Sequence, residues 1–205
     1  VIGDGNVVRV TKQIFQAPIP TTPRERRNRA AMLQLVHNTW IEGFLEKSLY
    51  GAVMLELGKD YDPQAVERPW DMEYHMPDQE RRLVPHGTPI SDIFDQCSGT
   101  MLILGDPGSG KTTTLLELAR DLIASAQEDE TRHIPVVFNL SSWAVEQAPF
   151  EEWLLEELGN KYKIPEKTAE SWIENDALLL LLDGLDEVKA IARDECVSAI
   201  NAFRE

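Results

Sequence analysis

Cysteine is scarce in this sequence, and its pattern fits neither a metal cage nor a disulfide framework. The two cysteines, Cys97 and Cys196, form no CxxC motif, and no histidine stands near them at zinc-ligand spacing. Such usage is typical of a reducing compartment. We therefore expect a cytoplasmic protein without disulfides or a structural zinc ion.

Long hydrophobic runs are missing as well. The longest apolar run, Ala177 to Leu182, is far shorter than the roughly 18 residues of a membrane-spanning helix. The opening residues VIGDGNVVRV contain no initiating Met and no basic stretch followed by an apolar core, so they do not resemble a secretory signal. We expect no membrane segment, and we interpret the chain as part of a longer protein.

Basic charge is in the minority. The chain has 20 Lys and Arg against 35 Asp and Glu, a formal net charge of −15, which repels polyanions at long range. We therefore expect no direct nucleic-acid partner. A local cluster of Arg24, Arg26, Arg27 and Arg29 either contacts a phosphate polymer or is a solvated first turn of a helix, and the acidic chain favours the solvated reading.

Residues 1–98 are expected to precede the main domain in two parts. Residues 1–21 are interpreted as a tail or linker, and residues 22–98 as a helical and loop-rich segment. Thr22, Pro23 and Glu25 have the spacing of a capping box, which predicts the start of a helix. The apolar face of that helix is expected to contain Leu33, Val36, Trp40 and Phe44, with Ile41, Leu45 and Leu49 beside them.

Residues 99–205 alternate between strand and helix patterns. Strands are expected over 100–104, 134–140 and 177–182, and helices over 112–126, 150–161, 165–175 and a final stretch through Ile191, Val197 and Ile200. This alternation predicts an α/β fold in which a parallel three-stranded sheet is covered by helices on both faces.

A glycine-rich loop stands between the first expected strand and its helix. Residues 105–112, GDPGSGKT, fit the pattern G-x-x-x-x-G-K-[ST] at every fixed position. In this placement, successive backbone N–H groups and the positive end of a helix converge on phosphate oxygens. The expected nucleotide-binding residues are Gly105, Asp106, Pro107, Gly108, Ser109, Gly110, Lys111, Thr112 and Thr113.

Side chains at the end of this loop have distinct expected roles. Lys111 is expected to bridge the terminal phosphates, Thr112 to offer its hydroxyl to Mg²⁺, and Thr113 to contact the α-phosphate. The competing reading is a glycine turn with a surface lysine, and the strand and helix on either side disfavour it.

An acidic turn follows the last expected strand. Asp183 stands at the carboxyl end of that strand, the edge where ligands bind in open α/β sheets, and is expected to hold Mg²⁺ directly or through water. Gly184 allows a sharp turn, after which Asp186 or Glu187 is expected to polarise the attacking water. The alternative is that these two carboxylates only solvate the start of the next helix.

These motifs resemble those of the NACHT family of signal-transducing NTPases. LLLLLDGLDE is similar to the extended Walker B of that family, and MLILGDPGSGKTTTLLELA and IPVVFNLSSW to its Walker A region and the following strand. Upstream, RNRAAMLQLVHNTWIEGFLEKSL and ERPWDM resemble the segment that precedes the NTPase core in multidomain bacterial members, so the likeness spans about residues 24–190.

The resemblance implies an ATPase switch of the STAND class of P-loop NTPases, with ATP or ADP and Mg²⁺ as cofactors. It implies a closed ADP-bound state, an ATP-bound state that self-associates, and sensor and effector domains outside this chain. The family's remaining strands, sensor residues and winged helix do not follow Glu205 here, so we expect this stretch to bind nucleotide but to lack groups that complete hydrolysis.

Three other functions compete with a slowly hydrolysing switch. One is a nucleotide-gated scaffold with negligible hydrolysis, in which Asp186 and Glu187 are structural. A phosphotransferase is less favoured, because LDGLDE shows no second-substrate pocket. DNA translocation fits poorly with the acidic chain.

Overall fold

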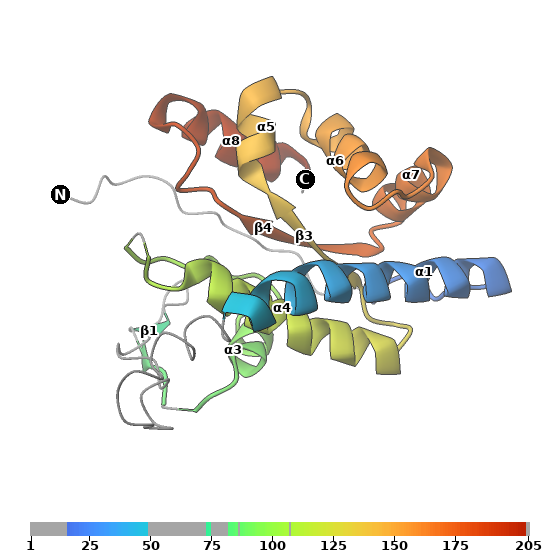
Figure 1. The fold of residues 1–205 in the computed structure, drawn as a ribbon, viewed down its shortest axis with the longest axis horizontal. Coiled ribbons are helices and arrows are strands. Elements are labelled where there is room, and N and C mark those ends of the chain that lie inside the picture. The colour runs from blue at the N-terminus through green and yellow to red at the C-terminus, as the bar shows by residue number, and fades with distance from the viewer. Residues whose placement is uncertain (1–15, 49–72, 75–81, 86, 107, 204–205) are drawn as a thin grey trace. The chain divides into compact units, whose positions relative to one another are not determined.

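The computed structural model describes residues 16–48, 73–74, 82–85, 87–106 and 108–203 (Figure 1). The helices are α1 (Pro23–Val36), the π-helical η1 (His37–Leu45), α3 (Ile90–Gln96), α4 (Lys111–Glu128), α5 (Leu140–Glu146), α6 (Phe150–Asn160), α7 (Glu166–Glu174) and α8 (Ala190–Phe203). The strands are β1 (Glu73–Tyr74), β2 (Arg82–Leu83), β3 (Ile134–Asn139) and β4 (Leu178–Asp183). The chain forms two compact units, one of Val1–Val36 with Ile123–Glu205 and one of His37–Leu122.

A parallel strand pair forms the centre of the first unit. β3 and β4 run in register from Ile134 opposite Leu178 to Asn139 opposite Asp183. Helix α1 contacts β3, and helices α5 to α8 lie on the other side of the strand pair (Figure 1). This mixed helix and strand arrangement confirms two of the predicted strands to within one residue and places Asn139 and Asp183 together at the carboxyl end of the pair.

Aromatic side chains fix α6 and the following turn onto β3. The Phe138 ring lies 5.7 Å from that of Trp153 and 6.0 Å from that of Tyr162, measured between centroids. The Tyr162 hydroxyl donates a hydrogen bond to the Val137 carbonyl, and Trp153 Nε1 donates to Ser142 Oγ at 3.1 Å. Trp153 and Tyr162 therefore each combine apolar contact with Phe138 and a satisfied polar group, which fixes the position of β3.

The predicted capping box is present at the start of α1. The Glu25 amide donates to Thr22 Oγ1 at 3.2 Å, and the Thr22 amide donates to Glu25 Oε2 at 3.2 Å. The Thr21 amide also donates to Glu25 Oε2, at 2.7 Å. Hydrogen bonds from the Thr21 and Thr22 amides lower the pKa of the Glu25 carboxyl, because they stabilise its charged form.

The expected apolar face of this helical region is confirmed at Leu33, Val36, Ile41 and Leu45 and is wrong for Phe44. Ile41 and Leu45 are buried, whereas Phe44 is 48% exposed and Trp40 is only half-buried. The backbone of η1 is π-helical, with hydrogen bonds that span five residues, so the buried positions step from Val36 to Ile41. Leu49 lies outside the described residues.

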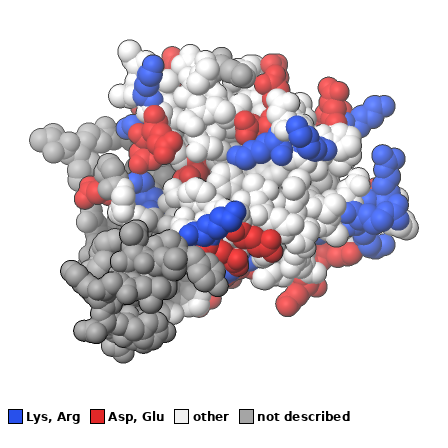
Figure 2. Space-filling view, viewed as in Figure 1, with Lys and Arg blue, Asp and Glu red and all other residues white. Residues whose placement is uncertain are grey.

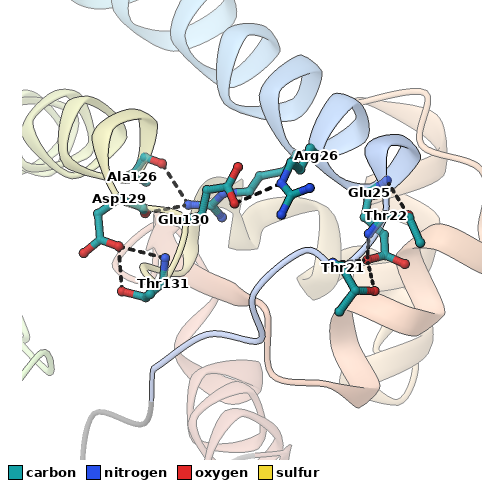
Figure 3. Close-up of polar contacts among 9 residues, drawn as sticks. Thr21, Thr22, Glu25, Arg26, Ala126, Asp129, Glu130 and Thr131 are labelled. Carbon is teal, nitrogen blue, oxygen red and sulfur yellow. Dashed lines mark hydrogen bonds and ion pairs between the residues drawn. The ribbon is translucent and has the colours of Figure 1, made fainter.

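The solvated reading of the arginine cluster is wrong for Arg29. This residue is 6% exposed, and its Nη2 donates to the carbonyls of Ala126 at 2.9 Å and Asp129 at 3.3 Å. Carbonyls at a helix C-terminus have no partner within the helix, so Arg29 caps the end of α4. Arg26 instead forms an exposed ion pair with Glu130 at 3.1 Å (Figure 3).

The expected strand over 100–104 is also wrong, since residues 100–106 are irregular. Leu102 is 55% exposed and Leu104 is 80% exposed. A strand requires a hydrogen-bonded neighbour for its backbone groups, and within the described ranges β3 pairs only with β4. An antiparallel pair, β1 with β2, lies within residues 22–98, where the sequence indicates helices and loops.

Candidate functional site

The glycine-rich loop, residues 105–110, leads directly into α4 and belongs to the His37–Leu122 unit. Gly108 has φ +81° and Gly110 has φ +83°, a left-handed conformation that glycine adopts without steric cost. A Cβ atom at either position would meet nothing within 4 Å. Backbone conformation, and not crowding, therefore requires glycine here, and the surface beside both residues is open. Pro107 lies outside the described residues.

The first glycine of the loop has a different constraint. A Cβ atom at Gly105 would collide with Ser109 Oγ. The Ser109 amide donates to the Asp106 carbonyl at 3.1 Å, and the Thr114 amide donates to the Gly110 carbonyl at 2.9 Å as the helix begins. The loop thus folds back on itself before α4, and Gly105 permits that close approach.

Lys111 reaches back over the glycine-rich loop. Its Nζ donates to the carbonyls of Gly105 and Asp106, each at 3.0 Å. Lys111 is the first residue of α4, and Thr112 and Thr113, both half-buried, follow it. The first turn of a helix presents unpaired N–H groups and a partial positive charge. An ammonium group, open glycine surface and a helix N-terminus therefore occur together, which suits binding of an anion.

The acidic turn, residues 183–188, belongs to the other unit and begins where β4 ends. Gly184 is buried and has φ +80°. A Cβ atom there would lie 3.2 Å from Asn139 Oδ1 and 3.4 Å from Glu187 Oε2. Both the conformation and the close packing therefore require glycine, and they bring the Asn139 carboxamide and the Glu187 carboxylate to the same place.

Main-chain hydrogen bonds hold the acidic turn. The Glu187 amide donates to the Gly184 carbonyl at 3.0 Å. Arg193, on α8, donates from Nη2 to the carbonyls of Asp186 at 2.9 Å and Val188 at 3.1 Å. Val188 is only 1% exposed and anchors the turn, while the side chains of Asp186 and Glu187 are exposed. The turn therefore has a fixed backbone and presents two carboxylates to solvent.

Asn139 and Arg193 are two site residues that the sequence reasoning missed. Asn139 Oδ1 accepts hydrogen bonds from the Ser141 amide at 2.8 Å and from the Ser141 hydroxyl, so it caps α5 beside the acidic turn. A signal for it exists, because an Asn directly after a buried apolar run and before Leu-Ser-Ser is typical of a helix N-cap. Arg193 has no such signal, since its role depends on the packing of α8.

A divalent cation would find few protein ligands here. Among the residues that the structure describes, no three His, Cys, Asp or Glu side chains form a group that could hold a metal ion. Mg²⁺ commonly takes one or two protein ligands and completes its shell with phosphate oxygens and water. The Thr112 hydroxyl and the Asp183 carboxylate, which belong to different units, are each oxygen ligands of the kind that Mg²⁺ accepts.

Comparison with known proteins identifies one family. The model of the NACHT domain matches residues 99–201, a stretch that contains both the glycine-rich loop and the acidic turn. No curated protein and no solved structure matches the chain. Of the helices in the described ranges, none is long and apolar enough to cross a membrane.

Proposed function

The chain belongs to the NACHT domain family, and from this premise we propose that it binds Mg²⁺-ATP and that the intact protein acts as a nucleotide-dependent switch that hydrolyses ATP slowly to ADP and phosphate. Membership of this family implies nucleotide binding. The main support for this proposal is the position of Lys111 at the start of α4. Its Nζ lies 3.0 Å from the carbonyls of Gly105 and Asp106, directly over the glycine-rich loop.

Phosphate binding is assigned to the glycine-rich loop. In this proposal the Lys111 ammonium exchanges its two carbonyl partners for oxygens of the terminal phosphates, which form stronger, charge-assisted hydrogen bonds. Gly108 and Gly110 leave room for backbone N–H groups to approach the phosphates. Thr113 adds a contact to the α-phosphate. Binding then needs no broad basic surface, because the recognition groups are local.

Metal binding and water activation are assigned to three carboxylates and one hydroxyl. The Thr112 hydroxyl and the Asp183 carboxylate are the proposed ligands of Mg²⁺, which when bound neutralises charge on the phosphates. Asp186 and Glu187 are proposed to orient and polarise the attacking water. Support comes from the fixed backbone of the acidic turn, which holds exposed carboxylates in a defined place.

The proposed switch between ATP-bound and ADP-bound states involves domains outside this chain. By resemblance to the family, the ATP-bound form self-associates through the NTPase domain, and the ADP-bound form is the resting state. Sensor and effector domains outside this chain supply the trigger and the output. ATP is proposed over GTP on the same resemblance, because the loop residues contact phosphates only.

Single-turnover release of phosphate from the intact protein tests this proposal. Glu187→Gln and Asp186→Asn should retain Mg²⁺-ATP binding, and the variant of the residue that activates water should slow release about 10²- to 10⁴-fold. Glu156→Gln, an exposed carboxylate on α6, is the matched control and should hydrolyse normally.

Two other outcomes would change the conclusion. If both variants release phosphate at the unaltered rate, the assignment of these carboxylates to hydrolysis is wrong. If the unaltered protein binds ATP but releases no phosphate, the protein is a nucleotide-gated scaffold and not an ATPase.

A further inference from the structure

Arg193 forms the connection between α8 and the acidic turn. Its Nη2 donates to the Asp186 carbonyl at 2.9 Å and to the Val188 carbonyl at 3.1 Å. These two carbonyls belong to the residues on either side of Glu187. Together with the bond from the Glu187 amide to the Gly184 carbonyl at 3.0 Å, they fix the backbone immediately before and after Glu187.

We propose that Arg193 is a positioning residue that sets the place of the Glu187 carboxylate for activation of water. The inference rests on the proposed function, in which Glu187 or its neighbour Asp186 orients that water. Arg193 bonds to the turn through backbone carbonyls, so in this proposal it acts through the backbone that carries Glu187 and does not itself touch substrate.

The helix that carries Arg193 is held in place by packing. The neighbours of Arg193 on α8, Ala192 and Cys196, are 4% and 0% exposed, so the helix that carries the guanidinium is packed. The Arg193 amide donates to the Lys189 carbonyl at 3.1 Å, which sets the first turn of that helix. A guanidinium is planar and rigid, so two hydrogen bonds from one nitrogen hold the turn at a set distance from α8.

The two nitrogens Nε and Nη2 of Arg193 differ in their hydrogen bonding. Arg193 Nε is buried and has no hydrogen-bond partner in the described part of the chain. Burial of an unbonded donor is unfavourable, so the two carbonyl bonds of Nη2 are what offsets it. Both hydrogen bonds of the Arg193 guanidinium within the described part of the chain go to the acidic turn.

The position of the Glu187 side chain depends on this backbone. A Cβ atom added at Gly184 would lie 3.4 Å from Glu187 Oε2 and 3.5 Å from Asn139 Nδ2. These two side-chain atoms therefore lie close to the same point beside Gly184. Asn139 Oδ1 is engaged by Ser141, which sets the orientation of the carboxamide. A shift of the turn would move the carboxylate away from this fixed point, and displacements of about 1 Å cost up to about a hundredfold in rate.

A double-variant experiment on the intact protein separates positioning from a general structural role. Arg193→Gln should lower the single-turnover rate of phosphate release about 10- to 100-fold, with Mg²⁺-ATP affinity unchanged. Arg193→Lys, which keeps a cationic donor, should recover part of the rate. The double variant of Arg193→Gln with Glu187→Gln should be no slower than Glu187→Gln alone. Arg132→Gln, an arginine 49% exposed, is the control and should behave as the unaltered protein.

The alternative outcomes distinguish this inference from the proposed function. If both Arg193 variants lose ATP affinity and phosphate-release rate to the same extent, Arg193 has a general structural role and the positioning proposal is wrong. The same holds if the double variant releases phosphate more slowly than Glu187→Gln by the full factor seen for Arg193→Gln alone. A normal rate in Arg193→Gln with a slow Glu187→Gln overturns only the inference. A normal rate in both Glu187→Gln and Asp186→Asn overturns the proposed water-activating carboxylates themselves. If Arg193→Gln does not fold, the Lys variant and its double with Glu187→Gln give the same comparison.

Discussion

At the scale of single residues, glycines of this chain serve different physical purposes. Gly108 and Gly110 need a left-handed backbone but have open space beside them, whereas Gly184 needs that backbone and is also crowded by Asn139 and Glu187. Gly159, within α6, has neither constraint. The sequence pattern identifies the loop glycines but does not rank them, because crowding depends on side chains distant in sequence.

Substitution of Gly184 tests this difference. Gly184→Ala should destabilise the fold by about 1–2 kcal/mol, because a left-handed backbone is unfavourable for a residue with a Cβ, and contacts with Asn139 and Glu187 add to the cost. Gly159→Ala should be neutral or stabilise by up to about 1 kcal/mol. Denaturant unfolding measures both, and equal stability of Gly184→Ala and the unaltered protein would contradict the observed turn.

Some residues of the candidate site could be predicted from short sequence patterns, and others depend on packing between distant parts of the chain. The glycine-rich loop and Lys111 follow from motif spacing, and Asp183 follows from its place at the end of an apolar run. Asn139 was not predicted, although an Asn after an apolar run and before Leu-Ser-Ser is a local signal for a helix N-cap; its place beside Asp183 depends on the register of β3 with β4. Arg193 was not predicted, because its role depends on the packing of α8, which has no short-range pattern in the sequence.

At the scale of elements, α1 and α4 are joined by arginines of the cluster that begins at Arg24. Arg29 is buried and caps the end of α4 through Ala126 and Asp129. Burial lowers the pKa of the Arg29 guanidinium, and the charges of Glu130 and Asp129 act in the opposite direction. Arg26 lies one turn earlier and pairs with Glu130 in solvent. The two arginines therefore differ in burial and not in sequence neighbourhood.

Replacement of each arginine by methionine tests that distinction. Arg29→Met should reduce the free energy of unfolding by about 1–3 kcal/mol, because it removes the donor from the buried Ala126 carbonyl. Arg26→Met should cost about 0–1 kcal/mol, since exposed ion pairs contribute little. Equal losses in the two variants, measured by denaturant unfolding, would show that the buried cap has no special contribution.

Most elements were predictable from hydrophobic periodicity, and the failures have physical causes. β3, β4, α4 and α6 match their predicted ranges closely, because apolar runs and amphipathic faces are local signals. Residues 100–104 do not belong to either sheet among the residues described, and apolar composition alone does not supply a partner strand. The π-helical η1 changes which residues are buried, and a period of 3.6 does not anticipate it.

At the scale of the whole molecule, the charge of −15 constrains how a nucleotide is bound. Acidic and basic side chains are interspersed on the face drawn in Figure 2. Overall negative charge repels a polyanion, but salt largely screens charges more than about 8–10 Å apart, so acidic side chains farther than that from the loop contribute little to the potential at the phosphate site. Nucleotide binding in this account therefore depends on the loop amides, Lys111 and a metal ion.

Calorimetric titration of Mg²⁺-ATP into the intact protein and its Lys111→Ala variant tests this central claim most directly. The account predicts a loss of about 1.5–3 kcal/mol of binding free energy, the contribution of a hydrogen bond to a charged group, which is about a 10- to 150-fold rise in Kd. Lys167→Ala, an exposed lysine on α7, should bind as the unaltered protein does. An unchanged affinity in Lys111→Ala would contradict the claim that this loop binds the phosphates.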